Sequence, residues 1–351
     1  MMIFDIVTIG SVTRDNFLES DYEIIKWLKA PSGEALILPF GEKLEVEKVY
    51  STIGGNSANA SITFARQGFK AACFGKIGND LSGREIKERL RKEKVRPLFA
   101  VSKVKPTAYS VLLLKGGERT ILGYHGASDM MTSGDIPWKS LKAKWWYLSL
   151  AGESDKFLKP LLLFARKNKI KVAFNPSGHH IRHKRKEILS VLKDLAFLVL
   201  NKSEAADLLR ISFKKEKEVF KKLDKLTPGI VAVTDGSSGV IVSDGKYLYK
   251  AGIFSEKKLA DRTGAGDAFG SGFVAGFMEK LQDCNITELQ KSKDKLVISN
   301  LQSAIKYSIR LASANATSVV EKVGATEGIL TKNQFQSARW KSFPVKISQL
   351  R

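Results

Sequence analysis

The sequence predicts an α/β fold with three layers (α/β/α), in which helices cover both faces of a mainly parallel central sheet. Short apolar runs alternate with amphipathic stretches along most of the 351 residues. Strands buried on both faces of a parallel sheet have this continuous apolar character. Two segments, 17–50 and 95–124, break the alternation with hairpin-like patterns. They predict a small second sheet, inserted as a lid into a single domain over residues 1–351.

The elements follow in order along the chain. Ile3–Gly10 is an apolar run that ends at glycine, and it predicts the first strand. Ser57–Gln67 predicts a helix, Ala71–Ile77 the next strand, and Asp80–Glu93 an amphipathic helix. Later strands are expected at Trp145–Leu150, Val172–Asn175, Phe197–Leu200 and Ile230–Thr234, and most are separated by helices near Ser154–Asn168, Glu187–Lys193, Ser203–Leu209 and Lys214–Leu226.

The inserted segments carry the clearest hairpin pattern. Pro106–Gly117, followed by Glu118–Leu122, predicts two antiparallel strands joined by a glycine turn. Such strands suit either a lid or the contact of a homodimer, and the pattern does not distinguish the two.

The composition excludes several classes of protein. No apolar run of about 18 residues occurs, so no membrane span is predicted. The two cysteines, Cys73 and Cys284, provide neither a disulfide framework nor metal-site spacing, and a cytoplasmic location is expected.

The net charge of +22 is compatible with nucleic acid or with small anionic ligands. The lysines and arginines are spread along the chain, with a dense basic stretch at His179–Lys186. No nucleic-acid recognition motif accompanies it, so nucleic-acid binding is not expected. His125, His179, His180 and His183 are expected at the surface rather than in catalysis.

The run with the clearest chemical meaning is Leu259–Phe277, which predicts a buried helix that begins in Gly264-Ala265-Gly266. Free amide groups and the positive end of the helix dipole meet at such a start and favour a phosphate. Asp267, in the first turn, is placed to accept a proton from a hydroxyl group beside that phosphate. The alternative is a helix that is glycine-rich only for close packing. A P-loop and a dinucleotide fingerprint are both absent.

Two motifs together resemble those of the ribokinase-like (pfkB-type) carbohydrate kinases. Asp261–Asp267 is similar to the C-terminal signature of that family, with Arg262 where Thr or Ser is usual, and Gly54–Asn59 is similar to its sugar-binding loop. The resemblance extends from about Ile3 to Ile329. It implies a ribokinase-like fold and ATP-dependent phosphorylation of a hydroxyl, expected to be a primary one. In that reaction Asp267 would be the base, and the amides of Gly264, Ala265 and Gly266 would form the anion hole.

The resemblance also implies residues that bind the acceptor. Asp15, after the first strand, matches the acid that holds substrate hydroxyl groups. Gly54, Gly55, Asn56 and Asn59 match the substrate loop, although Asn and Ser also favour helix caps. Arg119, in the predicted hairpin, could reach a phosphate or acidic group, and a solvated arginine is the equal alternative.

Residues for the nucleotide and metals follow in the same way. Asn201 and Glu204 match a motif that acts on Mg²⁺ and phosphate through water, which suits an ion that keeps several waters. Taken alone, Asn201–Glu204 would indicate a helix cap, which is the alternative. The resemblance further implies contacts to ATP from Thr234, Gly236, Gly239 and Ser313, an adenine-pocket wall ending at Gly324-Ala325, and a monovalent cation such as K⁺ beside Asp261 and Thr263.

Two other functions remain open from the sequence. A nucleoside kinase of the same fold would need an apolar pocket for the base, for which Phe17, Tyr109 and Tyr124 are candidates. A sugar-binding regulator without catalysis is the second, and the intact Asp267 argues against it. The acceptor is not identified, because only Glu153 stands where many ribokinases have a sugar-binding acid.

Overall fold

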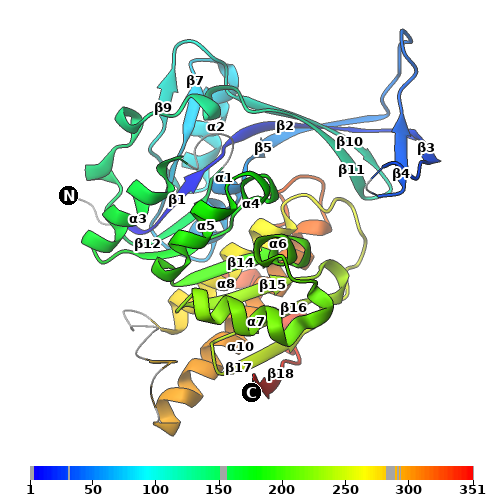
Figure 1. Ribbon diagram of the computed structural model, residues 1–351. Helices are drawn as coiled ribbons and strands as arrows, with labels where there is room; N and C mark the ends of the chain where they lie inside the picture. The colour runs from blue at the N-terminus through cyan, green and yellow to red at the C-terminus, as the bar shows by residue number, and fades with distance from the viewer. Residues whose placement is uncertain are drawn as a thin grey trace.

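The central layer of the computed structural model is a large twisted sheet (Figure 1). The structure describes residues 4–30, 32–150, 156–281, 289–290, 292 and 294–350, and among these ten strands form the sheet. Its order is β18 (Lys346–Gln349), β17 (Tyr247–Ala251), β16 (Val240–Ser243), β15 (Ile230–Thr234), β14 (Phe197–Asn201), β13 (Lys171–Phe174), β12 (Ala143–Ser149), β1 (Phe4–Gly10), β6 (Ala71–Phe74) and β8 (Arg96–Pro97). Pairing is parallel from β15 to β8 and antiparallel from β15 to β18.

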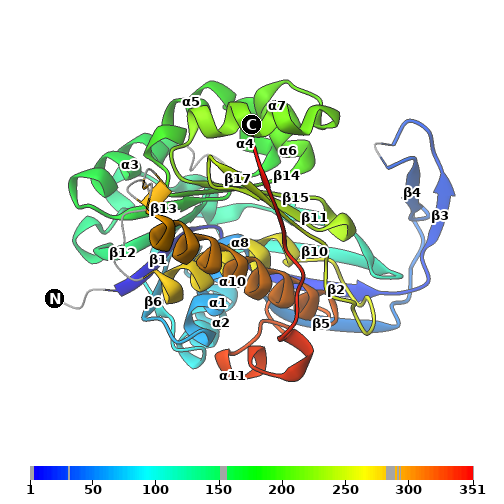
Figure 2. The same cartoon turned by 90° about the horizontal axis from the view of Figure 1, so that it is seen from below.

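Helices cover both faces of this sheet, as Figure 2 shows from below. One face carries α1 (Asn56–Arg66), α8 (Ala265–Lys280) and α10 (Lys295–Val320), and the other carries α3 (Leu158–Lys167), α5 (Arg185–Val191), α6 (Lys202–Leu209) and α7 (Glu216–Leu226). Successive residues of a strand point to opposite faces, so Ile6 belongs to the first core and Val7 to the second. The predicted three-layer, mainly parallel fold is confirmed.

The local patterns explain where the elements begin and end. The expected helix at 80–93 is α2 (Leu81–Lys92), and the Asp80 side chain caps it by accepting a hydrogen bond from the Gly83 amide at 2.8 Å. The basic stretch 179–186 includes most of α4 (Gly178–His183) and the start of α5. The expectation that His180 lies at the surface was wrong, because packing around α4 leaves it 2% exposed.

A second sheet stands over one edge of the main sheet. It contains β11 (Glu118–Tyr124), β10 (Ala108–Lys115), β2 (Thr13–Glu19) and β5 (Lys48–Gly54), in that order, and we call it the lid sheet. The predicted hairpin of β10 and β11 is confirmed. Elsewhere in the inserted segments, β8 joins the main sheet and β9 (Ala100–Ser102) pairs with β7 (Lys76–Gly78).

The connection from β2 to β5 forms a hairpin of β3 (Glu23–Lys26) and β4 (Glu34–Ile37), which projects away from the body of the molecule (Figure 1). Among the described residues, no helix is long and apolar enough to cross a lipid bilayer.

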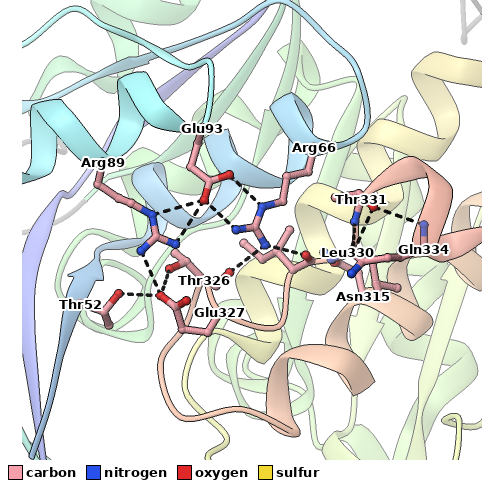
Figure 3. A network of polar contacts seen from close by, with 11 residues as sticks. Thr52, Arg66, Arg89, Glu93, Asn315, Thr326, Glu327, Leu330, Thr331 and Gln334 are labelled. Atoms are coloured by element: carbon pink, nitrogen blue, oxygen red, sulfur yellow. Dashed lines mark hydrogen bonds and ion pairs between the residues drawn. The ribbon is translucent and has the colours of Figure 1, made fainter.

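A network of ion pairs joins α1, α2 and the segment after α10 (Figure 3). Arg66 donates to both carboxylate oxygens of Glu93, at 2.9 and 2.7 Å, and to the carbonyl groups of Thr326 and Ile329, at 3.2 and 2.7 Å. Arg89 connects Glu93 to Glu327, and Figure 3 shows Thr52 of the lid sheet joined to Glu327 as well. The network therefore ties the base of the lid sheet to the segment after α10.

Replacing Arg66 by alanine is expected to lower the free energy of unfolding by about 2–3 kcal/mol, measured by urea denaturation. The change leaves two carbonyl groups without their donor and the half-buried Glu93 with Arg89 as its remaining partner, at a cost below that of a fully buried pair. Lys43→Ala is the control, because Lys43 and Glu45 form an ion pair with side chains 87% and 88% exposed. Equal effects of the two variants would contradict a structural role for the network.

Candidate active site

A cavity of about 580 Å³ lies between the lid sheet and the starts of α1 and α8. Most of the predicted acceptor and catalytic residues line this cavity, although they lie far apart in the chain. Its walls include Asp15, Gly55, Asn56, Asn59, Arg119, Thr263, Gly264 and Asp267.

Asp267 lies in the first turn of α8 at the edge of this cavity and is 8% exposed. Burial raises the pKa of its carboxyl group to about 6, a hydrogen bond from Asn59 lowers it, and the charge of Asp15 raises it again. The Nδ2 atom of Asn59 donates to Oδ2 of Asp267 at 2.9 Å. A carboxylate with this pKa is ionised at neutral pH yet more basic than an exposed aspartate, which suits a general base.

The start of α8 lies at the cavity, with Gly264 and Asp267 among its lining residues and Ala265 and Gly266 just outside that set. Gly264 is the N-cap with φ of +81°, a left-handed conformation that favours glycine, and a Cβ atom there would lie 2.6 Å from the Cβ of Ala325. The Ala265 amide makes a long bond of 3.4 Å to the Arg262 carbonyl, and the Gly266 amide has no acceptor within the helix because it lies in the first turn. The arrangement suits an anion.

Asp15 lies opposite, on strand β2 of the lid sheet. The Thr13 hydroxyl donates to Oδ1 of Asp15 at 2.7 Å, and the side chain is 5% exposed. Burial raises the pKa of Asp15, while hydrogen bonds from Thr13 and Ser110 lower it. Gly54 makes room for this carboxylate, since a Cβ atom at Gly54 would lie 1.8 Å from its Oδ2.

The two asparagines of the predicted substrate loop have different partners. Asn56 donates to the Ser149 hydroxyl at 3.0 Å, which fixes its side chain at the cavity wall. Asn59 donates to Asp267, so it positions the carboxylate of the candidate base. Sequence reasoning assigned Asn59 to the acceptor alone and did not find this contact, because the two residues are 208 positions apart.

The residues expected at the nucleotide lie outside this cavity. Asn201 and Thr234 are paired neighbours at the ends of the parallel strands β14 and β15. Asn201 and Glu204 cap α6 reciprocally, each side chain accepting from the other's amide at 2.8 Å, so the cap alternative holds as well. The remaining residues, Gly236 and Gly239 in the turn after β15 and Ser313 inside α10, do not line the cavity.

Glu204 is suited to a divalent cation. Burial raises its pKa, the amide bond from Asn201 and the charge of Arg182 lower it, and the charges of Asp207 and Asp267 raise it again. A carboxylate whose pKa is raised by burial is stabilised in its charged form by a bound cation. No group of three or more His, Cys, Asp or Glu ligands occurs among the described residues, and Mg²⁺ needs few protein ligands.

The side chains of Asp261 and Thr263 are less suited to a cation. Asp261 is fully buried, and its carboxylate accepts from the Thr263 amide and hydroxyl, at 2.9 and 2.7 Å, and from the Gly324 amide at 3.2 Å. These bonds hold the anion-hole loop to the segment after α10. A monovalent cation beside these residues would have to use backbone carbonyl groups.

Other side chains complete the cavity. His125, His179, Ser110 and Asp129 line it and were not predicted, although Ser110 pairs with Asp15 in the lid sheet. Of the aromatic residues considered for a nucleoside base, only Tyr124 lines the cavity. Phe17 is fully buried, and Tyr109 is 40% exposed elsewhere. Glu153 lies outside the described residues.

The chain is similar to known kinases over most of its length. The family profile for the pfkB family carbohydrate kinases matches residues 6–332. Ribokinase of Lactococcus lactis subsp. lactis is 25% identical over 293 residues, which cover 82% of this chain and 86% of that protein. Cytidine kinase of Thermococcus kodakarensis is 26% identical over 281 residues, covering 76% and 93%.

Solved structures share the fold. Ribokinase from Giardia lamblia superposes with a TM-score of 0.76 at 21% identity, covering 96% of this chain and 99% of that chain. Adenosine kinase from Sinorhizobium meliloti gives 0.74 at 19% identity, covering 95% and 98%. The fold is therefore ribokinase-like, and the related enzymes are kinases of sugars or nucleosides. The protein belongs to the pfkB family of carbohydrate kinases and is a phosphotransferase with an alcohol group as acceptor.

Proposed function

We propose that the protein transfers the terminal phosphoryl group of ATP to a primary hydroxyl of a sugar or sugar-like small molecule, with Asp267 as the catalytic base. One observation carries this proposal. Asp267 and Gly264, the N-cap of α8, line the same cavity as Asp15 and Asn56. A hydroxyl group held by Asp15 and Asn56 would therefore lie between a base and an anion site.

The steps follow from these positions. Asp15 and Asn56 bind hydroxyl groups of the acceptor, and Asp267 accepts the proton of the hydroxyl that attacks. The amides of Gly264, Ala265 and Gly266 stabilise the charge on the transferring phosphoryl group. Positioning and electrostatic stabilisation provide most of the rate enhancement in phosphoryl transfer.

The nucleotide residues are part of the same proposal. Asn201 and Glu204 would hold Mg²⁺ through water, and the ion would neutralise charge on the phosphates. Thr234, Gly236 and Gly239 would contact the phosphates or ribose of ATP, with Ser313 as a neighbour of the adenine. A K⁺ ion beside Asp261 and Thr263 would be bound by carbonyl groups, since both side chains bond to each other.

The test is a coupled assay of ADP release over a panel of sugars, sugar acids and nucleosides, with ATP and Mg²⁺. Saturable release with at least one sugar-like acceptor is expected. No release with any acceptor would overturn the proposal. Omission of K⁺ from the buffer tests the monovalent cation separately.

A nucleoside acceptor is the second candidate, favoured by Tyr124 at the cavity wall. An aromatic ring there could stack on a base. If adenosine or cytidine has a higher kcat/KM than ribose, and Tyr124→Ala lowers only the nucleoside activity, the acceptor is a nucleoside.

The pH dependence tests how Asn59 positions the base. Asn59→Leu removes the hydrogen bond to Asp267 and is expected to raise the midpoint of the acidic limb of kcat by about one to two pH units, because a hydrogen bond to a charged group contributes about 1.5–3 kcal/mol. Activity falls as the pH drops through this midpoint, since the base becomes protonated. Asn56→Leu, which changes the same loop without touching Asp267, should leave the midpoint in place. An equal shift of the midpoint in both variants would contradict the proposal that Asn59 positions the base.

We also propose that the outer face of the lid sheet binds a second copy of the chain. Val49, Tyr109 and Leu122 are 62%, 40% and 55% exposed on strands β5, β10 and β11. Exposed apolar side chains on neighbouring strands are suited to an interface. Sedimentation velocity of the wild type and of Leu122→Glu would detect the homodimer and its loss.

A further inference from the structure

We propose that the acceptor carries an anionic group, either a phosphate or a carboxylate, and that Arg119 binds it. The inference rests on the proposed function and adds the chemical class of the acceptor. It is carried by an arginine that lines the cavity with a buried Nε atom lacking a hydrogen-bond partner and with only a long ion pair to Glu118, together with the contact that holds Glu118 toward another arginine.

Strand register directs Arg119 into the cavity. Arg119 is opposite Leu114, and Gly123 is opposite Ser110, in the antiparallel pair β10 and β11. Alternate residues of a strand share a face. Arg119, Ile121 and Gly123 therefore lie on one face of β11, and all three line the cavity together with Ser110.

The guanidinium group of Arg119 is only weakly paired within the protein. Its side chain is 27% exposed, and its buried Nε atom has no hydrogen-bond partner. The one carboxylate that approaches it among the described residues is Glu118, with Nη1 and Oε2 3.9 Å apart. A buried donor without a partner is costly, and an anionic ligand would remove that cost.

Glu118 is held by another arginine. The Nε atom of Arg262 donates to Oε1 of Glu118 at 2.5 Å, between the loop of the anion hole and the turn of the lid hairpin. Arg262 is the residue that departs from the usual Thr or Ser of the family signature. Arg262 therefore binds the carboxylate of Glu118, which would otherwise be free to pair with Arg119.

The other charged residues of the cavity fit an acceptor that carries hydroxyl groups at one end and an anionic group at the other. Asp15, Asp129 and Asp267 line the same cavity, and none of them forms an ion pair with Arg119 in the part of the chain that the structure describes. Arg119 lies four positions before Gly123, a distance of about 13 Å along the strand, and Gly123 is level with Asp15 across the lid sheet. Hydroxyl groups would bind near Asp15, and the anionic group near Arg119.

The alternative ligand for Arg119 is a phosphate of ATP. Arg119 shares its cavity with Asp15, Gly55, Asn56 and Asn59, the predicted acceptor residues, and with Gly264 of the proposed anion hole. The predicted residues for the rest of the nucleotide, Asn201, Thr234, Gly236, Gly239 and Ser313, do not line it. The acceptor is therefore the better assignment for the ligand of Arg119. The kinetic measurements below distinguish an anionic acceptor from a phosphate of ATP.

The experiment compares acceptors that differ in charge but keep a free primary hydroxyl. The pairs are ribose and ribose 1-phosphate, fructose and fructose 6-phosphate, and glucose and gluconate. For at least one pair, kcat/KM of the wild type is expected to be about 100-fold higher for the anionic member, a ratio typical of a charge-assisted double hydrogen bond. The phosphate and carboxylate pairs show which anion is bound.

Arg119→Gln is expected to reduce that ratio about 100-fold, mainly through KM of the anionic acceptor, and Arg119→Lys to restore part of it. Arg262→Thr should reduce the ratio about 3–10-fold, since it releases Glu118. Lys48→Gln, which removes a positive charge from another strand of the lid sheet, is the control and should leave the ratio unchanged.

Three outcomes would overturn the inference while leaving the proposed function intact. They are equal activity on both members of every pair, a ratio that Arg119→Gln does not change, and a rise in KM for ATP alone. If no acceptor is phosphorylated, the proposed function fails instead. Calorimetric titration with ribose 1-phosphate and fructose 6-phosphate, on the wild type and Arg119→Gln, then decides the inference on binding alone. Binding that is absent, or equal in both proteins, would overturn it.

Discussion

Asp267→Asn should reduce kcat about 1000-fold at pH 8 while the affinity for ATP changes by less than a few fold, because a general base contributes about 10²–10⁴-fold to the rate. Asparagine keeps the size of the side chain and can still accept the hydrogen bond from Asn59. The loss of activity should therefore appear in kcat and not in the affinity for ATP. Steady-state kinetics with the best acceptor, with ATP binding measured by calorimetry, checks both statements.

The matched control is Asp207→Asn, which removes an exposed acid near Glu204 and should keep nearly full turnover. Asp267→Asn with wild-type turnover would remove Asp267 from the mechanism and the proposed function with it.

The same substitution should stabilise the fold. The pKa of Asp267 rises from 3.8 to about 6 on folding, chiefly through burial. A carboxyl group whose pKa is raised in the folded state lowers stability as the pH rises from about 4 through 6, and a shift of about two units corresponds to about 3 kcal/mol. Asp267→Asn should therefore unfold at higher urea than the wild type at pH 8, and the difference should shrink toward pH 5. A destabilised variant at pH 8 would contradict the burial of this charge.

Gly264→Val is the second variant with a large expected effect. A side chain at φ of +81° costs about 1–2 kcal/mol, and its Cβ atom would overlap Ala325. The loop must shift, which displaces the amides of the anion hole, so kcat should fall about 100–1000-fold. Turnover and urea denaturation measure the two effects.

Gly245→Val separates strain from function. Gly245 has φ of +85° and no atom within 4 Å of an added Cβ, so the backbone strain is matched without the overlap. It should lose stability by about 1–2 kcal/mol and keep its turnover. If both variants lost turnover to the same extent, backbone strain and not displacement of the proposed anion hole would explain the effect at Gly264.

The sequence predicts most of what depends on local pattern. The apolar runs of β1 and β14, the amphipathic helix α2 and the hairpin of β10 and β11 are periodic or turn signals, and the structure has them in place. The start of α8 was predicted because the glycines and Asp267 are neighbours in the chain.

Contacts between distant segments could not be predicted in this way. The bond from Asn59 to Asp267, and the cavity positions of His125, His179 and Asp129, depend on how the lid sheet meets the main sheet. Strand β18 was not predicted either, because it pairs with β17 from almost 100 residues further along the chain.

The bond between Asn59 and Asp267 also has a consequence for synthesis of the protein. Asn59 is made early and Asp267 late, and α10, which packs on α8, follows still later. Contacts at such sequence separation form slowly, and a nascent chain cannot form them until its later segments leave the ribosome. Asn59 must therefore wait in a partly folded intermediate, without the acid that later accepts its hydrogen bond. Appearance of kinase activity during translation would report completion of the whole sheet rather than folding of its first half.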